Sequence, residues 1–538
     1  MKRRDFLKRA GFLASVGVSG IADVCFAKDK KKKRKPNVIF IITDDQDRDS
    51  FGFLNGKALT PHIDKLAAEG VFFNKAYVTT SVCTPSRYTC LTGRYASRCQ
   101  SGKFLKQGIT EEGQTWVHWN ADIGKKETNI AKTLRDAGYA TGVVGKLHGF
   151  EMAGHSKHIN IKSDHNDPEI IKTLKDDQRT FAAELKEHGF TDAKNMHRGN
   201  LGSGRAIPLA LCEHAPEWTA EGAINFIEEN KDQPFYLYYA TTLLHGPSPM
   251  QSLKADPRIS EIGMLDKTPD VMPSRQSVFD RVKKADINEE LAPATWLDDS
   301  VGAILNKIEE LGLKDDTLVI YFNDHASEGG KGSLYQGGIH TQTIISWPGK
   351  IKPAQSEQLI SNIDFVPTIL NACKVKKPSD MKVDGRNLMP LLTGKKDKTV
   401  DSLFFEIGYT RAVVTDQYKY LAFRVPPSRT DSKEVRMQKI QDLIKKSPKK
   451  SPLENNPEGK ITHIHRSPGG DGTELGNAVK HYSETYYDAD QLYDVVNDPR
   501  ERVNLADDPK YAEVLKKMKG KLKKHLKKAP GTFAEFKS

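Results

Sequence analysis

The stretch Asn37-Val-Ile-Phe-Ile-Ile-Thr43 is an unbroken run of apolar and β-branched residues, and Asp44 and Asp45 follow it directly. A run of this kind predicts a strand that is buried on both faces, as in the parallel sheets of α/β proteins. Similar strand patterns recur along the chain and alternate with helix patterns, at helices 61–69, 129–137, 218–230 and 291–313 and strands 139–144, 234–241 and 317–323. The alternation indicates a doubly wound, mostly parallel α/β sheet that is flanked by helices.

The pattern changes after residue 394. Two strand patterns, 403–407 and 411–423, are followed by a polar stretch over 426–475 and a final helix over 510–528. A chain of 538 residues is also longer than one hydrophobic core usually supports. We therefore expect a catalytic α/β domain over 37–394 and a smaller C-terminal α+β subdomain over 395–538.

The first residues have the composition of an export signal. In residues 1–27 a basic start, MKRRDFLKR, precedes a short apolar run that ends at Ala27 and is interrupted by glycine and serine. The run is too short to span a bilayer, so we expect no transmembrane segment. The Arg3-Arg4 pair favours a bacterial twin-arginine signal over an ordinary secretory one. Residues 28–36 form a basic leader, and we expect a periplasmic or secreted protein.

The formal net charge of +12 is concentrated at the two ends of the chain. Residues 1–35 hold twelve basic and three acidic residues, and residues 507–538 hold ten basic and four acidic residues. The body between them, 36–506, has a net charge of −3. A nucleic-acid-binding fold carries its positive charge on the body, so we expect no nucleic-acid partner. A mean hydropathy of −0.57 excludes a polytopic membrane protein.

Acidic residues follow two of the predicted strands. Asp44 and Asp45 come after the first strand, and Asp324 and His325 come at the end of the strand 317–323. The carboxyl ends of parallel strands meet at one edge of a sheet, where polar ligands bind. Carboxylate oxygens suit Ca²⁺ or Mg²⁺, so the two pairs together favour a metal site over two unrelated helix caps.

Removal of the signal leaves five cysteines, an odd number for an exported protein. Cys90 and Cys99 could pair, and spacing alone leaves this open. Cys83 stands where a helix over the following residues would begin, because Pro85 suits the first turn of a helix. Helix N-terminal N–H groups attract anions, and Arg87 adds a positive charge one turn on. Taken alone, Cys83 could be a reactive thiolate or a structural residue.

The motif Cys83-Thr-Pro-Ser-Arg87, with Leu91-Thr-Gly-Arg-Tyr95 after it, resembles the signature of the type I, formylglycine-dependent sulfatases of the alkaline-phosphatase-like superfamily. The resemblance extends over most of the chain, in the right order, through Asn37–Asp45, Gly145–Gly149, His245–Pro247, Asp324-His325, Lys331–Gly338 with Trp347–Gly349, Ile363–Thr368 and Leu492–Pro499. It implies an alkaline-phosphatase-like α/β fold and a sulfuric ester hydrolase. Ala326, Gln336 and His340 depart from the usual glycine, glutamate and arginine, which puts the local loop shape in question.

The resemblance also implies the cofactors. Cys83 would be oxidised to 3-oxoalanine (formylglycine) by a formylglycine-generating or equivalent maturation enzyme. A hydroxyl of the hydrated aldehyde would attack sulfur and expel the alcohol, and sulfate would then leave by elimination. One Ca²⁺ would polarise the sulfate and the attacking hydroxyl. Its implied ligands are Asp44, Asp45, the residue at position 83, Asp324 and His325.

The resemblance implies a role for the remaining matching residues. Arg87 would hold the hydrate, and Lys146 and Lys331 would offset charge on the sulfuryl oxygens. His148 would be the base for elimination. His245, together with Lys331, would protonate the leaving oxygen.

The substrate and two other functions stay open from sequence alone. Trp116–Trp119 and His463, His465, Arg466 and His481 suit sugar and sulfate binding, or equally a packed tryptophan pair and solvated loop histidines. With basic ends on an exported chain, we expect a sulfated polysaccharide or oligosaccharide. The alternatives are a phosphodiesterase or phosphonate monoester hydrolase on the same scaffold, and a non-catalytic polyanion-binding protein with an unmodified Cys83.

Overall fold

The computed structural model describes residues 34–152, 156, 158–201, 207–396, 400–429, 432, 434–435, 438, 485 and 488–538. The predicted signal, most of the basic leader and the loop residues His463, His465, Arg466 and His481 lie outside these ranges. From Lys35 to Ser538 the chain forms one compact unit.

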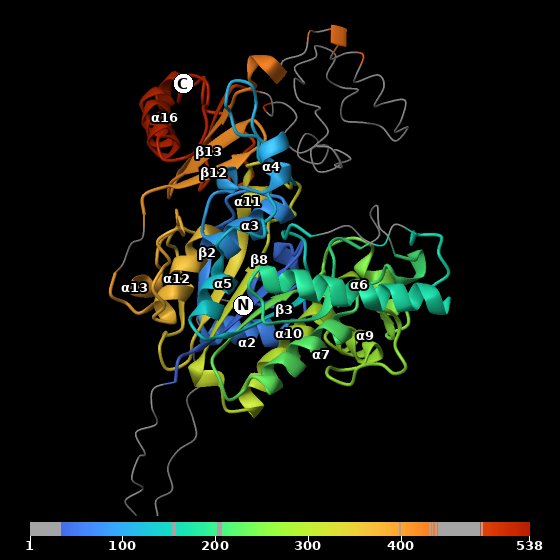
Figure 1. The fold of residues 1–538 in the computed structure, drawn as a ribbon. Helices are drawn as coiled ribbons and strands as arrows, with labels where there is room; N and C mark the ends of the chain where they lie inside the picture. Colours follow the sequence, from blue (N-terminus) through green and yellow to red (C-terminus); the bar gives the residue numbers. More distant parts are fainter. Residues whose placement is uncertain are drawn as a thin grey trace, which may run out of the picture. The chain divides into compact units, whose positions relative to one another are not determined.

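A nine-stranded sheet forms the centre of this unit (Figure 1). Its strand order is β10-β2-β9-β8-β1-β5-β3-β4, and β11 pairs with β2. All neighbours are parallel except β9, which is antiparallel to both β2 and β8. The strands are β1 Asn37–Thr43, β2 Val71–Tyr77, β3 Ala140–Lys146, β4 Asp192–His197, β5 Phe235–Ala240, β8 Thr317–Asn323, β9 His340–Ser346, β10 Ala354–Ser356 and β11 Ile360–Ser361.

Strand β1 shows why its sequence is continuously apolar. Val38, Phe40 and Ile42 enter a core beneath one helical layer, and Ile39 and Ile41 enter a second core on the opposite face. Successive side chains of a strand point to opposite faces, so a central strand that is covered on both sides needs apolar residues at every position. This confirms the predicted doubly wound α/β fold.

Helices cover both faces of the sheet. The first face packs against α3 Cys83–Thr92, α5 Ile130–Asp136, α6 Pro168–Glu187 and α12 Phe365–Ala372. The second packs against α2 Pro61–Glu69, α7 Pro216–Glu229, α8 Pro249–Lys254, α9 Arg275–Lys284 and α10 Ala292–Glu310. The short elements are α1 Gly52–Asn55, α4 Gly102–Gln107, α11 Gln336–Ile339, α13 Met389–Leu392 and the pair β6 Ile259–Ser260 and β7 Gly263–Met264.

A four-stranded antiparallel sheet forms the smaller C-terminal part. It has the order β12 Leu403–Ile407, β13 Thr410–Val414, β14 Tyr418–Phe423 and β15 Asp490–Asp494. One face joins the core of the large sheet through residues such as Phe405 and Leu421. The other face, which includes Tyr420, is covered by α16 Ala512–Leu526 (Figure 1).

The elements predicted from sequence are confirmed to within a few residues, with one error. The single strand expected over 411–423 is wrong, because β13 and β14 form a hairpin. Thr415 and Tyr418 close its turn: Thr415 N donates to the carbonyl of Tyr418, and Tyr418 N donates to Thr415 Oγ1. The apolar pattern continues on both sides of Asp416 and hides this turn. The elements β2, β4, β9 and α6 were not predicted from sequence.

The helices in the described part of the chain include none with the length and apolar character needed to cross a membrane.

Candidate active site

The parallel strands bring the predicted site residues to one edge of the large sheet. Asp44 and Asp45 follow β1, Asp324 and His325 follow β8, and Lys146 is the last residue of β3. His245 lies after β5, the strand between β1 and β3. Because β1, β3, β5 and β8 run in the same direction, their carboxyl ends share this edge.

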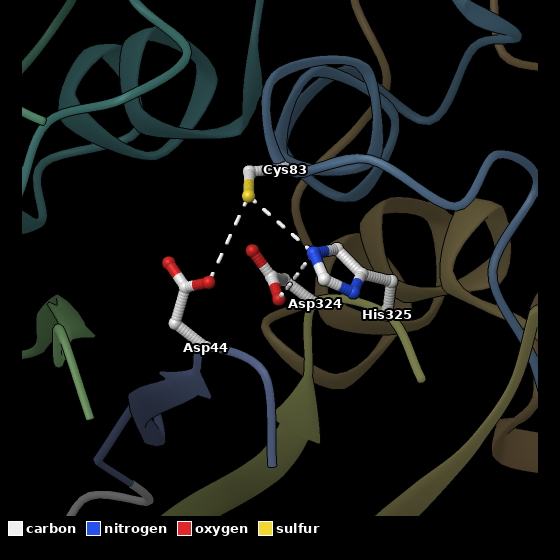
Figure 2. Close-up of side chains that lie close together, drawn as sticks. All are labelled: Asp44, Cys83, Asp324 and His325. Atoms are coloured by element: carbon white, nitrogen blue, oxygen red, sulfur yellow. Dashed lines mark hydrogen bonds and ion pairs between the residues drawn. The ribbon is translucent and has the colours of Figure 1, made fainter. Parts of the chain in front are cut away.

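Cys83 is the first residue of α3, and its sulfur points toward the acidic residues (Figure 2). The Sγ atom lies 3.7 Å from Asp44 Oδ1 and 3.4 Å from His325 Nε2. Burial and the neighbouring Asp44 carboxylate raise the pKa of the Cys83 thiol well above its usual value. The unmodified side chain is therefore a neutral thiol, unlike the thiolate of a cysteine nucleophile.

Arg87, one turn further along α3, is fully buried and links both acidic pairs. Its Nη2 atom donates to Asp44 Oδ2 at 2.9 Å and to Asp324 Oδ2 at 3.0 Å, and Nη1 donates to Tyr238 at 3.3 Å. A guanidinium presents several donors in a fixed plane, so one side chain fixes two carboxylates from different strands.

Two lysines complete the charge balance of the site. Lys146 is buried and contacts Asp44 Oδ2, while Lys331 Nζ lies 2.8 Å from Asp45 Oδ1 and 2.9 Å from Oδ2. Burial by itself would raise the pKa of Asp44, but Lys146, His245 and Arg87 outweigh it and hold that pKa well below the ordinary value. The pKa of Asp45 is likewise lowered, because His325 and Lys331 outweigh its burial. Both carboxyls are thus ionised.

Two of the predicted histidines contact different residues of the site. His148 Nε2 is 2.9 Å from the hydroxyl of Thr84, the neighbour of Cys83. His245 Nε2 is 3.7 Å from Asp45 Oδ2. The structure therefore brings together all the residues that the sequence nominated as catalytic or metal-binding.

The geometry around His325 tests whether a cation fits. Its Nδ1 atom lies 3.1 Å from the carbonyl of Ala326, which can only accept, so in the neutral ring Nδ1 carries the proton. The Nε2 lone pair then faces Asp45 Oδ1 at 3.3 Å and Asp324 Oδ1 at 3.5 Å. Asp324 Oδ1 is buried and has no hydrogen-bond partner among the described residues. His325 Nε2, Asp45 Oδ1 and Asp324 Oδ1 are thus three acceptors that face one another, and a cation between them would bind to all three.

Two further combinations of residues support this donor set. Ligand atoms of Asp44, Cys83, Asp324 and His325 all lie within 4.8 Å of one another (Figure 2), as do those of Asp44, Asp45 and His245. Carboxylate oxygens provide two of the four ligand atoms in the first set and two of the three in the second, and oxygen ligands are those that Ca²⁺ prefers. Calcium therefore fits the residues that are present.

Three residues at the site were missed by the sequence analysis. Tyr238 contacts Arg87, and Asn323 bonds to Gln46 through its side chain and so joins the loop after β1 to the loop after β8. The third residue, His214, contacts the loop that carries His245. Its Nε2 atom is 2.8 Å from the carbonyl of His245 and 3.2 Å from that of Pro247, and Nδ1 is 2.7 Å from the Thr242 hydroxyl. Only Asn323 had a sequence signal, its position next to Asp324.

Of the three residues that depart from the family pattern, Ala326 contacts His325 through its carbonyl, and the other two lie away from the cluster. His340 does not contact the cluster. Its Nε2 atom is 2.6 Å from the carbonyl of Asn74, and its ring stacks on Tyr77. The Gln336 side chain also contacts Tyr77. The Trp116–Trp119 segment pairs with the turn between β12 and β13 through Val117, and Trp116 stacks on Tyr409.

Cys90 and Cys99 are both buried with reduced thiols, so they do not form a disulfide with each other. Cys99 Sγ instead contacts Ser101 and the carbonyl of Asp122.

Comparison with known proteins identifies the family. The Sulfatase family model matches residues 36–375, and the model for the C-terminal part of N-sulphoglucosamine sulphohydrolase matches residues 330–439. An arylsulfatase of Hemicentrotus pulcherrimus is 26% identical over 407 residues, a match that spans 69% of this chain and 64% of that protein. The N-acetylgalactosamine-6-O-sulfatase of Bacteroides thetaiotaomicron is 26% identical over 464 residues, 73% of this chain and 83% of that enzyme.

A solved structure from work on the metabolism of multiple glycosaminoglycans by Bacteroides thetaiotaomicron has the same fold. It aligns with a TM-score of 0.55 at 21% identity and covers 92% of this chain and 100% of that one. The family model spans well over half of the sequence and includes every residue of the cluster at the sheet edge. The chain belongs to the sulfatase family and is a sulfuric ester hydrolase, a type I sulfatase of the alkaline-phosphatase-like superfamily.

Proposed function

We propose that this chain is an exported, calcium-dependent sulfatase that hydrolyses the sulfate esters of a sulfated polysaccharide or oligosaccharide, with formylglycine formed from Cys83. One observation carries the proposal. At the N-terminus of α3, Cys83 lies close to Asp44, Asp324 and His325, and the buried Asp324 Oδ1 has no hydrogen-bond donor among the residues that the structure describes. A nucleophile position therefore lies next to a donor set that suits a cation.

The two groups that the family implies would supply distinct chemistry. A hydrated aldehyde at position 83 supplies a hydroxyl nucleophile and a second hydroxyl that allows sulfate to be released by elimination. Calcium bound by Asp44, Asp45, residue 83, Asp324 and His325 supplies positive charge to the sulfate and the attacking oxygen. The neutral Cys83 thiol in its buried surroundings supports a modified residue over a thiolate nucleophile.

The remaining residues have assignable tasks. Arg87, buried between Asp44 and Asp324, holds the nucleophile's helix and the metal-binding carboxylates in one arrangement. Lys146 and Lys331 lie at these carboxylates, where they offset the charge of a bound sulfate.

Two histidines are placed to move protons. His148 Nε2, next to Thr84, would accept the proton of the hydroxyl at residue 83 during elimination. His245 Nε2 would donate to the leaving alcohol oxygen, assisted by Lys331, since both lie at Asp45. His214 holds the loop of His245 in place through two carbonyls.

The substrate class is supported by the names of the matched proteins. One relative is an N-acetylgalactosamine-6-O-sulfatase, and the second family model derives from N-sulphoglucosamine sulphohydrolase. Both names describe sulfated sugars. The basic termini and the signal-like residues 1–27 fit an exported enzyme that acts on a polyanion.

The test measures inorganic sulfate and inorganic phosphate released from a panel of sulfated glycans, an aryl sulfate and its phosphate analogue. The protein is co-expressed with a formylglycine-generating enzyme and assayed with calcium. Cys83→Ala is the blank, and Cys373→Ala is the matched control, since Cys373 is also buried but lies outside the cluster. Peptide mass spectrometry reports the state of residue 83 in each preparation.

We expect sulfate release from at least one glycan, lost with Cys83→Ala and retained with Cys373→Ala. Faster phosphate than sulfate release from matched esters would overturn the proposal in favour of a phosphodiesterase or phosphonate monoester hydrolase. An intact thiol at residue 83 in an active preparation would overturn the formylglycine mechanism.

A further inference from the structure

The outer surface of α16 concentrates positive charge that nothing in the catalytic cluster uses. Met518, Leu522 and Leu526 of α16 are buried and pack on the small sheet. The other positions of the helix, with the two residues that follow its last turn, are mostly lysine. Figure 1 shows where α16 lies. The exposed lysines are Lys516, Lys517, Lys523, Lys524, Lys527 and Lys528. We define these six residues as the α16 lysine face.

Helix geometry places these lysines in two neighbouring rows. At about 100° per residue, Lys516, Lys523 and Lys527 fall within about 40° of one another. Lys517, Lys524 and Lys528 form a second row about 100° away. The rows extend over about 18 Å along the axis, at 1.5 Å per residue. This is a linear array of charge rather than a scatter of single lysines.

The charge is little neutralised. Lys516 lies 3.8 Å from Glu513, a pair that is 79% and 88% exposed and therefore weak. Within the described ranges no acidic side chain lies within 4 Å of the ammonium groups of the other five lysines. The body of the chain is slightly acidic, so the positive potential of the C-terminal segment is local to it.

Gly520 lies between the two rows, and no packing requirement accounts for it. A Cβ atom at Gly520 would meet nothing within 4 Å, and its backbone is an ordinary helix. Glycine weakens a helix interior relative to alanine. Because Gly520 has no side chain, the helix surface between the two rows is lower at this point. A polysaccharide chain can lie there with lysines on both sides.

We propose that the α16 lysine face is a docking surface for a sulfated polysaccharide chain, separate from the catalytic cluster. The choice of ligand rests on the proposed function, and the linear charge array rests on the structure alone. The exposed positions of α16 are lysine, glycine, Glu513 and Ala512. They include no aromatic residue for stacking nucleic-acid bases and no large apolar residue for insertion into lipid.

The test compares two variants with the same loss of charge. The first combines Lys516→Gln, Lys517→Gln, Lys523→Gln and Lys524→Gln. The control combines Lys172→Gln, Lys175→Gln, Lys283→Gln and Lys284→Gln, four exposed lysines of α6 and α9. Heparin binding is measured by calorimetry at two salt concentrations, beside duplex DNA and phosphatidylserine vesicles as other polyanions. Aryl sulfate turnover reports whether the active site is intact.

We expect the first variant to bind heparin roughly tenfold more weakly, with a shallower salt dependence, and the control to change less than twofold. Aryl sulfate turnover should be unchanged in both. Gly520→Glu should weaken heparin binding several-fold without a loss of helix, and Gly520→Ala should have little effect.

Equal heparin binding by the two charge variants would overturn the proposal. Tighter, lysine-dependent binding of vesicles or DNA than of heparin would overturn it in favour of a membrane or nucleic-acid surface. Because binding is read without catalysis, lysine-dependent heparin binding by a protein that releases no sulfate would support the surface and refute the proposed function.

Discussion

Two groups of acidic and histidine side chains in this protein lie close enough to share a metal ion. One is the cluster of Asp44, Cys83, Asp324 and His325 at the edge of the sheet, and the other is His62, Asp298 and Asp299 between α2 and α10. Both are largely buried. By residue type alone, each is a candidate metal site.

Their hydrogen bonds separate the two groups. Asp298 accepts from the backbone N–H groups of His62 and Ile63, at 3.1 and 2.7 Å, and so caps the first turn of α2. Asp299 forms a two-point ion pair with Arg281. In the cluster at the sheet edge, by contrast, Asp324 Oδ1 has no donor among the described residues and faces the Nε2 atom of His325.

The contrast shows how a ligand site differs from a structural one. Buried polar atoms are nearly always hydrogen-bonded, because leaving one unpaired is costly. The group at α2 satisfies its acceptors within the protein and holds two helices together. The sheet-edge cluster leaves an acceptor open, which a cation can satisfy. Changes in the two groups should therefore differ in their effects on activity and on the response to calcium.

The largest expected effect is the loss of activity in Asp324→Asn. This change replaces a proposed calcium ligand and removes one negative charge from the cluster. Because calcium should then bind more weakly, kcat/KM for an aryl sulfate should fall about 10²–10³-fold. Stability in chelator should fall as well, because Asp324 Oδ2 forms a buried ion pair with Arg87 that a neutral asparagine cannot keep. A steady-state assay of calcium-loaded protein checks the first point, and denaturant unfolding in chelator checks the second. An activity loss below threefold would contradict the assignment.

Asp298→Ala is expected to lose stability but to keep its activity. Two buried N–H groups at the start of α2 lose their acceptor, so the free energy of unfolding should fall by about 2–3 kcal/mol. Activity per folded molecule and the response to calcium should match the unchanged protein. Denaturant unfolding with and without calcium provides the measurement. Loss of the calcium response in this variant would mean that the α2 group is the metal site.

A smaller effect is expected at His214. Both of its ring nitrogens form hydrogen bonds, and these bonds hold the loop of His245. Burial lowers its pKa to about 3, well below the ordinary 6.5. Its contribution to stability is therefore present above pH 6.5 and is lost as the pH falls toward 3, because only the unfolded chain gains the proton. The free energy of unfolding should fall by about 1 kcal/mol per pH unit near pH 5 from this residue. In His214→Gln that part of the slope should disappear.

His340 is the matched control, since burial also lowers its pKa, to about 4, and it lies against Asn74 and Tyr77. His340→Gln should reduce the slope similarly but leave aryl sulfate turnover unchanged. His214→Gln should also lower kcat, because it releases the carbonyl that holds the His245 loop. Equal activity in the two variants would show that His214 is purely structural.

Much of this arrangement could be predicted from sequence, because the signals were local and periodic. The run of β1 and the helix pattern of α2 depend on burial at regular spacing, and both were located to the residue. The acidic pairs were recognisable because they directly follow buried strands. The motif that begins at Cys83 was recognisable by its resemblance to a known family.

What sequence could not provide depends on contacts between distant segments. His214 meets the His245 loop only in the folded chain, and nothing in its own neighbourhood indicates this. The turn at Asp416 was hidden by apolar residues on both sides. The oxygen of Asp324 without a donor among the described residues and the hydrogen-bonded oxygens of Asp298 depend on which groups the fold brings near them, and the residues next to each aspartate in the sequence do not show this.

Calcium titration tests the central claim most directly. Thermal unfolding and calorimetry are followed with calcium and with chelator for the unchanged protein, Asp324→Asn and Asp298→Ala. We predict that calcium stabilises the unchanged protein and Asp298→Ala equally, by about 2.7 kcal/mol when its concentration is 100 times the dissociation constant, and that Asp324→Asn gains nothing. A calcium response that survives in Asp324→Asn and disappears in Asp298→Ala would contradict the account.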